Sequence, residues 1–112
     1  MLVVDDEPAI RLLCRVNLEL EGFRVVEASS LDAARTELEA GGISLVLLDM
    51  RIGNERGDSL LDELRERGIP VVVVTGSAEL DAEWASRADA VLGKPFAIDD
   101  LLHAVRSLAV AR

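Results

Sequence analysis

Short apolar runs alternate with amphipathic stretches along the chain, and this alternation repeats five times. Residues 43–48 are apolar on both faces of a strand, as expected in the middle of a parallel sheet. Only a few residues connect successive units, and such repetition predicts a parallel sheet covered by helices on both faces. Because the connections between parallel strands are right-handed, only a few strand orders are possible for such a sheet. We therefore predict a single doubly wound α/β domain over residues 1–112, with no output domain.

Glycine, proline and serine mark the ends of several predicted elements. Pro8 suits the first turn of a helix, Gly22 follows the end of that helix, and Ser29 or Ser30 caps the next one. The predicted strands cover residues 2–4, 23–26, 43–48, 70–74 and 90–92. The predicted helices cover residues 7–20, 31–40, 59–67, 78–87 and 98–111, with a polar loop at 51–57.

Composition excludes several classes of protein. The net charge is −9 and half of the residues are apolar, so the chain is too hydrophobic to be disordered. Phosphates would be repelled by such a surface, which argues against nucleic-acid binding. The apolar run around residues 71–74 is too short to span a membrane, and one cysteine, Cys14, forms no internal disulfide. We expect a cytoplasmic protein without a signal peptide or a membrane partner.

Polar side chains stand where four of the predicted strands end. Asp5 and Asp6 follow the first strand, Asp49 the third, Thr75 the fourth and Lys94 the fifth. These strand ends share one edge of an open parallel sheet, where the functional crevice lies. Carboxylates in contact there repel each other by about 1 kcal/mol per pair even in water, so either a cation neutralises them or one of them is protonated.

The chemistry of these side chains favours phosphoryl transfer. Oxygen ligands in an open arrangement suit Mg²⁺, which keeps several of its water ligands. Asp49 ends a central strand and is the natural nucleophile, because aspartate can form an acyl phosphate. Lys94 and the hydroxyl of Thr75 would hold the remaining phosphoryl oxygens.

Each carboxylate also has a purely structural interpretation. Asp5 or Asp6 could cap the first helix, and Asp49 could be a turn residue at the end of its strand. Taken together with Lys94 at a further strand end, the set favours a shared function over coincidence.

The same residues lie in four motifs: VVDDEP at 3–8, LLDM at 47–50, VVTG at 73–76 and GKPF at 93–96. In order and spacing these motifs resemble the receiver domain of two-component response regulators, and the resemblance covers the whole chain. It implies the flavodoxin-like strand order 2-1-3-4-5. It also implies that Asp49 accepts a phosphoryl group from a histidine kinase or a histidine phosphotransfer protein.

The resemblance further implies a role for each residue of the metal site. Asp6 and Asp49 would ligate Mg²⁺ (or Mn²⁺) directly, and Asp5 would act mainly through water. The backbone carbonyl of Arg51 would complete the protein ligands.

For the other two strand ends, the resemblance implies contacts with the phosphoryl group. Thr75 would shift toward this group and Lys94 would pair with it, and the Lys94–Pro95 bond is expected to be cis. The chain would then be a switch rather than an enzyme, since it catalyses only its own phosphorylation and dephosphorylation. It would act as a monomer or weak homodimer and signal by contact with a downstream protein.

The chain departs from the family pattern near its fifth predicted strand. Val91 stands where the family usually has an aromatic residue, so the familiar coupling of threonine movement to aromatic rotation cannot operate in its standard form. The segment between Thr75 and Lys94 is shorter than is common in the family, which predicts a shortened fourth helix.

The first predicted helix is more apolar than a surface helix needs to be. One stripe consists of Ala9, Leu12, Leu13, Val16 and Leu20, and a second consists of Ile10, Cys14 and Leu18. A surface helix needs one such stripe, so we expect one to face the sheet and the other to be partly exposed. An exposed stripe would dock against the helical bundle of a kinase or phosphotransfer protein. The alternative is a helix that is buried on two sides.

Two rival functions stay open from the sequence. The first is a receiver-like binding module that switches by partner binding without phosphorylation. The second is a small Mg²⁺-dependent phosphatase that works through an aspartyl phosphate. Such phosphatases usually carry a second aspartate close after the nucleophile, whereas Met50 and Arg51 follow Asp49 here.

Overall fold

Five parallel strands form the central sheet of the protein. The structure, a computed structural model, describes residues 1–76 and 87–110. The strands are β1 (Leu2–Val4), β2 (Val26–Ala28), β3 (Val46–Asp49), β6 (Val71–Gly76) and β7 (Ala90–Lys94). Their order in the sheet is β2-β1-β3-β6-β7, and every neighbouring pair is parallel. The predicted strand order 2-1-3-4-5 is therefore confirmed.

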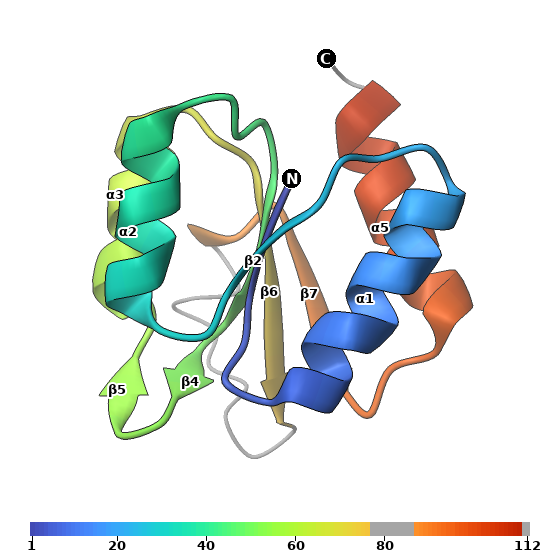
Figure 1. The fold of residues 1–112 in the computed structure, drawn as a ribbon, viewed down its shortest axis with the longest axis horizontal. Coiled ribbons are helices and arrows are strands. Elements are labelled where there is room, and N and C mark those ends of the chain that lie inside the picture. Colours follow the sequence, from blue (N-terminus) through green and yellow to red (C-terminus); the bar gives the residue numbers. More distant parts are fainter. Residues whose placement is uncertain (77–86, 111–112) are drawn as a thin grey trace.

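Helices cover both faces of this sheet (Figure 1). They are α1 (Pro8–Leu20), α2 (Leu31–Ala40), α3 (Asp58–Glu66) and α5 (Ile98–Val110). In Figure 1, α2 and α3 lie on one side of the sheet and α1 and α5 on the other, so the doubly wound arrangement is confirmed. The helix predicted at 78–87, and with it the shortened fourth helix, falls outside the described residues apart from Arg87.

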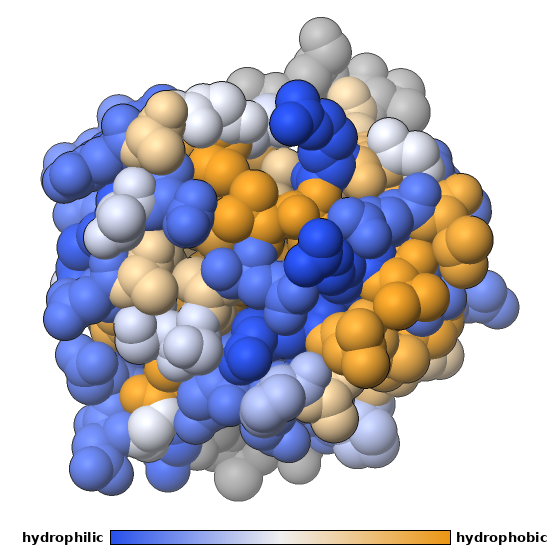
Figure 2. All heavy atoms as spheres, viewed as in Figure 1, coloured by the Kyte–Doolittle hydropathy of each residue, from blue (hydrophilic) through white to orange (hydrophobic). Residues whose placement is uncertain are grey.

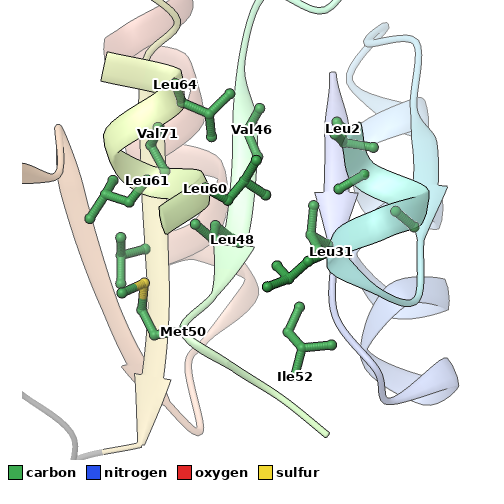
Figure 3. Close-up of a cluster of buried hydrophobic side chains, with 14 of the residues drawn as sticks. Leu2, Leu31, Val46, Leu48, Met50, Ile52, Leu60, Leu61, Leu64 and Val71 are labelled. Carbon is green, nitrogen blue, oxygen red and sulfur yellow. The ribbon is translucent and has the colours of Figure 1, made fainter. Parts of the chain in front are cut away.

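The core consists of two apolar layers, one on each face of the sheet. Leu2 and Val4 point into the layer beneath α2 and α3, whereas Val3 points into the layer beneath α1 and α5. Because successive strand residues face opposite sides, strands buried on both faces must be continuously apolar. Figure 3 shows the first layer, in which Leu60, Leu61 and Leu64 of α3 pack toward the strands. Burial of each leucine or valine side chain contributes about 1.5–3 kcal/mol to the free energy of unfolding.

The strand predicted at 23–26 was placed too early in the chain. In the structure β2 covers Val26–Ala28, and Leu2 of β1 pairs with Val26. Glu27 interrupts the apolar run, yet it belongs to this edge strand, where it pairs with Val3. Arg11 and Arg15 neutralise its carboxylate at 3.2 and 2.9 Å. The third strand likewise begins at Val46 rather than at residue 43.

The segment 51–57 was predicted as a loop, and this was wrong in part. It holds a short antiparallel pair, β4 (Arg51–Ile52) and β5 (Glu55–Arg56). Gly53 in the turn between them has a φ of 61°, which favours glycine. Ile52 is buried in the first core layer and anchors the pair, an apolar contact that the polar composition of the segment concealed.

Helix α1 presents its two apolar stripes as predicted. Cys14 and Leu18 are buried against the sheet and Ile10 packs beside them, whereas Leu12, Leu13, Val16 and Leu20 are exposed. The alternative of a helix buried on two sides is therefore wrong. The helices found in residues 1–76 and 87–110 include none that is both long and apolar enough to cross a membrane.

The buried thiol of Cys14 gives a first testable prediction. Burial raises the pKa of Cys14 to about 11, and the charge of Asp5 adds to this effect while Lys94 opposes it. The thiol of the folded protein therefore stays protonated until the pH rises toward 11, above its value in the unfolded chain. At pH 8.5 we expect iodoacetamide to modify the folded protein at least about tenfold more slowly than the guanidinium-unfolded protein.

The control for this measurement is a Cys14→Ser/Leu20→Cys variant, which carries its thiol at an exposed position of the same helix. Its rates in the folded and unfolded protein should be similar. Equal rates for Cys14 in the two states would contradict the prediction.

Candidate functional site

The register of the sheet brings the predicted site residues to one edge. Val4 pairs with Leu48, so Asp5 and Asp49, which directly follow them, leave the sheet side by side. On the other side of β3, Asp49 pairs with Val74, and Thr75 comes next along β6. Parallel strands thus place residues that are distant in sequence at the same end of the sheet.

Lys94, the last residue of β7, contacts three carboxylates at this end of the sheet. Its Nζ lies 3.0 Å from Oδ2 of Asp49, 3.1 Å from Oδ2 of Asp5 and 3.1 Å from Oε1 of Glu7. The side chains of Asp5 and Asp49 are almost fully buried, whereas that of Glu7 is 59% exposed. The lysine therefore binds two interior carboxylates and one at the mouth of the site.

The protonation equilibria of Lys94 and Asp49 reflect this crowding. Burial alone would lower the pKa of Lys94, but hydrogen bonds to Asp49 and Glu7 and the charges of Asp49 and Asp5 outweigh burial and raise it. Burial raises the pKa of Asp49, and Asp5 adds to the shift, although the Arg51 amide and Lys94 oppose it. The folded protein thus holds Lys94 charged and makes ionised Asp49 unfavourable.

Four carboxylates gather at this edge, and their oxygens could hold a cation. One oxygen from each of Asp5, Asp6, Glu7 and Asp49 lies within 4.8 Å of the others, in a search of the described residues. Carboxylate oxygens are the ligands that Mg²⁺ and Mn²⁺ prefer. Lys94 pairs with three of these four carboxylates, and a divalent cation fits both the donor set and the excess of negative charge. Asp5, Asp6 and Asp49 had been predicted for this role, and Glu7 had not.

Backbone amides of the β4–β5 hairpin fix two of these carboxylates. The amide of Arg51 donates to Oδ1 of Asp49 at 3.1 Å, and the amide of Gly53 donates to Oδ2 of Asp6 at 2.9 Å. The second bond joins the β4–β5 turn to the site, and no residue pattern predicted it because Gly53 contributes only its backbone. The role of the Arg51 carbonyl as a metal ligand stays a prediction.

Thr75 lies beside the acidic cluster in the buried end of β6. Its hydroxyl donates to the carbonyl of Gly76 at 3.1 Å, so in this structure it is directed to the backbone. Its neighbour across the sheet is Gly93, the residue before Lys94. The Lys94–Pro95 bond is cis, as the family resemblance implied.

The prediction that Asp5 or Asp6 caps the first helix is wrong, because Glu7 occupies the N-cap position without a side-chain cap bond, whereas Asp49 does shape the turn after its strand. Oδ1 of Asp5 accepts the amide of Glu7 at 2.9 Å, which shapes the entry into α1, although Glu7 itself occupies the N-cap position. Oδ1 of Asp49 shapes the turn after β3 in the same way. In each residue one oxygen serves the local backbone and the other, Oδ2, faces Lys94.

Comparison with known proteins links this arrangement to a family. The family model described as response regulator receiver domain matches residues 1–106. The KDP operon transcriptional regulatory protein KdpE of Escherichia coli is 34% identical over 95% of this chain and 49% of its own length. The alginate biosynthesis transcriptional regulatory protein AlgB of Pseudomonas aeruginosa is 39% identical over 98% of this chain and 26% of its own length. The chain thus spans about half or less of these curated relatives.

Two solved structures share the fold over nearly their whole length. The response regulator protein TrrA of Thermotoga maritima, in complex with Mg²⁺-BeF, superposes with a TM-score of 0.85 at 30% identity, and 96% of each chain is covered. The receiver domain of NtrX from Brucella abortus gives a TM-score of 0.85 at 34% identity, covering 96% of this chain and 97% of that one.

The electrostatics of the site predict that Asp49→Asn stabilises the fold. An asparagine can still accept the Arg51 amide through its side-chain oxygen, and it removes the charge that burial makes unfavourable. In EDTA at pH 7.5 we expect the melting temperature to rise by about 3 °C. Mg²⁺ should narrow this difference, because an ion that binds the folded wild type stabilises it.

Glu39→Gln is the matched control for net charge. Glu39 is exposed on α2, on the face of the sheet opposite α1. This variant should melt within about 1 °C of the wild type, as is usual for an exposed substitution. A lower melting temperature for Asp49→Asn would contradict the prediction.

Proposed function

The chain belongs to the response regulator receiver family, and from this premise we propose that it is a signalling switch controlled by phosphorylation of Asp49. Receiver domains are signalling switches rather than classical enzymes. The observation that carries the assignment of Asp49 is its position between Lys94 and the acidic cluster at the end of a central strand. The phosphoryl donor is a histidine kinase or a histidine phosphotransfer protein.

In the proposed reaction, a carboxylate oxygen of Asp49 attacks the phosphorus atom of a phosphohistidine. The new P–O bond replaces the P–N bond, and the departing histidine nitrogen takes up a proton. Hydrolysis later breaks the P–O bond of the acyl phosphate, releasing inorganic phosphate and regenerating the carboxylate. Asp49 is suited to the attack because the Arg51 amide and Lys94 hold its two oxygens in place.

The remaining residues stabilise the phosphoryl group. Lys94 Nζ, which lies 3.0 Å from Asp49, pairs with a phosphoryl oxygen. The Thr75 hydroxyl gives up its hydrogen bond to the Gly76 carbonyl and donates to another phosphoryl oxygen. Asp6, Asp49 and the Arg51 carbonyl would hold Mg²⁺ or Mn²⁺, with Asp5 acting through water. A bound divalent ion would neutralise negative charge that develops on the phosphoryl oxygens.

Phosphorylation changes the charge at this edge of the sheet. An aspartyl phosphate brings a strongly negative group into a site that already holds buried carboxylates. Local electrostatic changes of this size can bias a two-state surface, which a downstream protein then recognises. We propose that the signal leaves residues 1–112 through such a protein contact.

Intact-mass measurement tests the phosphorylation of Asp49. After incubation with acetyl phosphate and Mg²⁺, we expect the wild type to gain one phosphoryl group. EDTA should abolish the gain, and Asp49→Asn should not show it, because the amide is not a nucleophile.

Other outcomes of the same experiment identify the rivals. A folded wild type that gains no mass would support a binding module that works without phosphorylation. Rapid turnover of a generic phosphate ester would support the small Mg²⁺-dependent phosphatase.

The exposed stripe of α1 is the surface that we propose for docking the phosphoryl donor. Among the described residues, the large apolar side chains that stand exposed are Leu12, Leu13, Val16 and Leu20. Leu20 is 78% exposed and Leu12 59%. Figure 2 shows this apolar area as orange spheres on the side of the molecule where Figure 1 places α1. Exposed apolar surface of this kind is typical of an interaction site.

The position of α1 indicates what covers this stripe. The helix begins directly after Asp5, Asp6 and Glu7, so a protein that brings a phosphohistidine to Asp49 also reaches the first turns of α1. A helical bundle presents an apolar helix face that matches a stripe with i, i+4 spacing. We therefore propose that the donor's helical bundle packs on Leu12 and Val16.

A double variant, Leu12→Ala/Val16→Ala, tests this docking surface. With a histidine kinase that phosphorylates the wild type, we expect kcat/KM for phosphotransfer to fall roughly tenfold, since central apolar contacts carry much of the binding energy. Phosphorylation by acetyl phosphate should be unchanged, because the small donor makes no contact with α1. Equal loss with both donors would refute docking, and Glu39→Ala on α2 serves as the control for a surface substitution.

A further inference from the structure

Glu7 takes no part in the reaction described above, yet its carboxylate is bonded to the lysine that does. Its Oε1 lies 3.1 Å from Nζ of Lys94, and it is one of the four carboxylates of the acidic cluster. Unlike Asp5 and Asp49, it stands at the solvent side of the site with a largely exposed side chain.

The backbone of Glu7 is held firmly while its side chain reaches into the mouth of the site. Its amide donates to Oδ1 of Asp5 at 2.9 Å, and its carbonyl accepts the amide of Arg11 at 3.1 Å. Beyond this fixed backbone, the hydrogen bond to Lys94 holds the carboxylate of Glu7 in position. An incoming phosphoryl group must approach the same ammonium.

Two electrostatic effects of Glu7 act on that approach. Its negative charge repels an anionic donor, and its hydrogen bond uses one of the three hydrogens that Lys94 can donate. Removing Glu7 would not release the lysine, because Asp49 and Asp5 still hold it at 3.0 and 3.1 Å. Removing the charge of Glu7 therefore lowers its repulsion of an anionic donor while Lys94 keeps its position.

We propose that Glu7 is a specificity-determining residue that weakens the binding of free phosphoryl donors at Lys94. A protein donor gains affinity from its contacts with α1 and tolerates this penalty, whereas a small anionic donor has no such compensation. Glu7 would thereby favour phosphorylation by a docked protein over phosphorylation by free metabolites that carry a reactive phosphoryl group. This inference rests on the proposed function of Asp49.

The test compares the wild type with Glu7→Gln, which keeps the size of the side chain and an oxygen that can accept from Lys94. In saturating Mg²⁺ we expect the acetyl phosphate concentration at half-maximal rate to fall about threefold, the size expected of one exposed charge pair. The apparent Kd for beryllofluoride, measured by calorimetry in excess Mg²⁺, should fall by the same factor. Both differences should shrink in 1 M salt, because exposed charges are screened.

Glu39→Gln removes the same charge far from the site and is the matched control. Wild-type values for Glu39→Gln, together with tighter binding by Glu7→Gln, would support the inference. Equal effects of the two variants, or weaker binding by Glu7→Gln, would overturn it while leaving the function of Asp49 intact. If the wild type binds no beryllofluoride and gains no phosphoryl mass, the proposed function fails and the inference with it.

Discussion

The ammonium group of Lys94 counters a concentration of negative charge that the sheet itself creates. Asp5 and Asp49 follow neighbouring buried strands, so the register that pairs Val4 with Leu48 also brings their carboxylates together. Like charges in a partly buried site repel, and the fold tolerates them because Lys94 lies within about 3 Å of both. The apolar layers on the two faces of the sheet supply the stability that keeps the strands in this register. The crowded carboxylates at this end of the sheet are thus electrostatically unfavourable, and the packing of the core keeps them in place.

Close packing around Asp49 explains why its position is so well defined. Met50 is buried directly after it, and Gly57 returns the chain beneath it through a hydrogen bond to the Met50 carbonyl. A Cβ atom on Gly57 would lie 3.3 Å from the carbonyl oxygen of Asp49, from Cδ2 of Leu48 and from Sδ of Met50. The φ of Gly57 is −81°, so limited space rather than backbone conformation favours glycine there. The β4–β5 hairpin can therefore lie close to Asp49.

Periodicity was sufficient to predict a parallel sheet, because fully buried parallel strands leave a continuous apolar run, whereas the strand order was implied by the family resemblance. It failed where a charged residue belongs to a strand, as Glu27 does in β2, or where one buried side chain anchors a polar segment, as Ile52 does. The candidate site shows the same division. Residues that act through side chains at strand ends were found, whereas Gly53, which acts through its amide, was not. Glu7 was missed because it follows the strand by three residues and returns to the site through its contact with Lys94.

Two hydrogen bonds connect residues of the candidate site to backbone that lies nearer the surface. One runs from the amide of Gly53, in the exposed turn of the hairpin, to Asp6, and the other runs from the hydroxyl of Thr75 to the carbonyl of Gly76. Under the proposed function, Asp6 would share a metal ion with Asp49 and Thr75 would contact the phosphoryl group, so both bonds would change on phosphorylation. Val91 pairs with Val73 in the sheet and packs against the core, where the family usually carries an aromatic ring. Without that ring, the coupling of threonine movement to aromatic rotation cannot operate in its standard form, and under the proposed function a displacement of Thr75 would act through its bond to the backbone of β6.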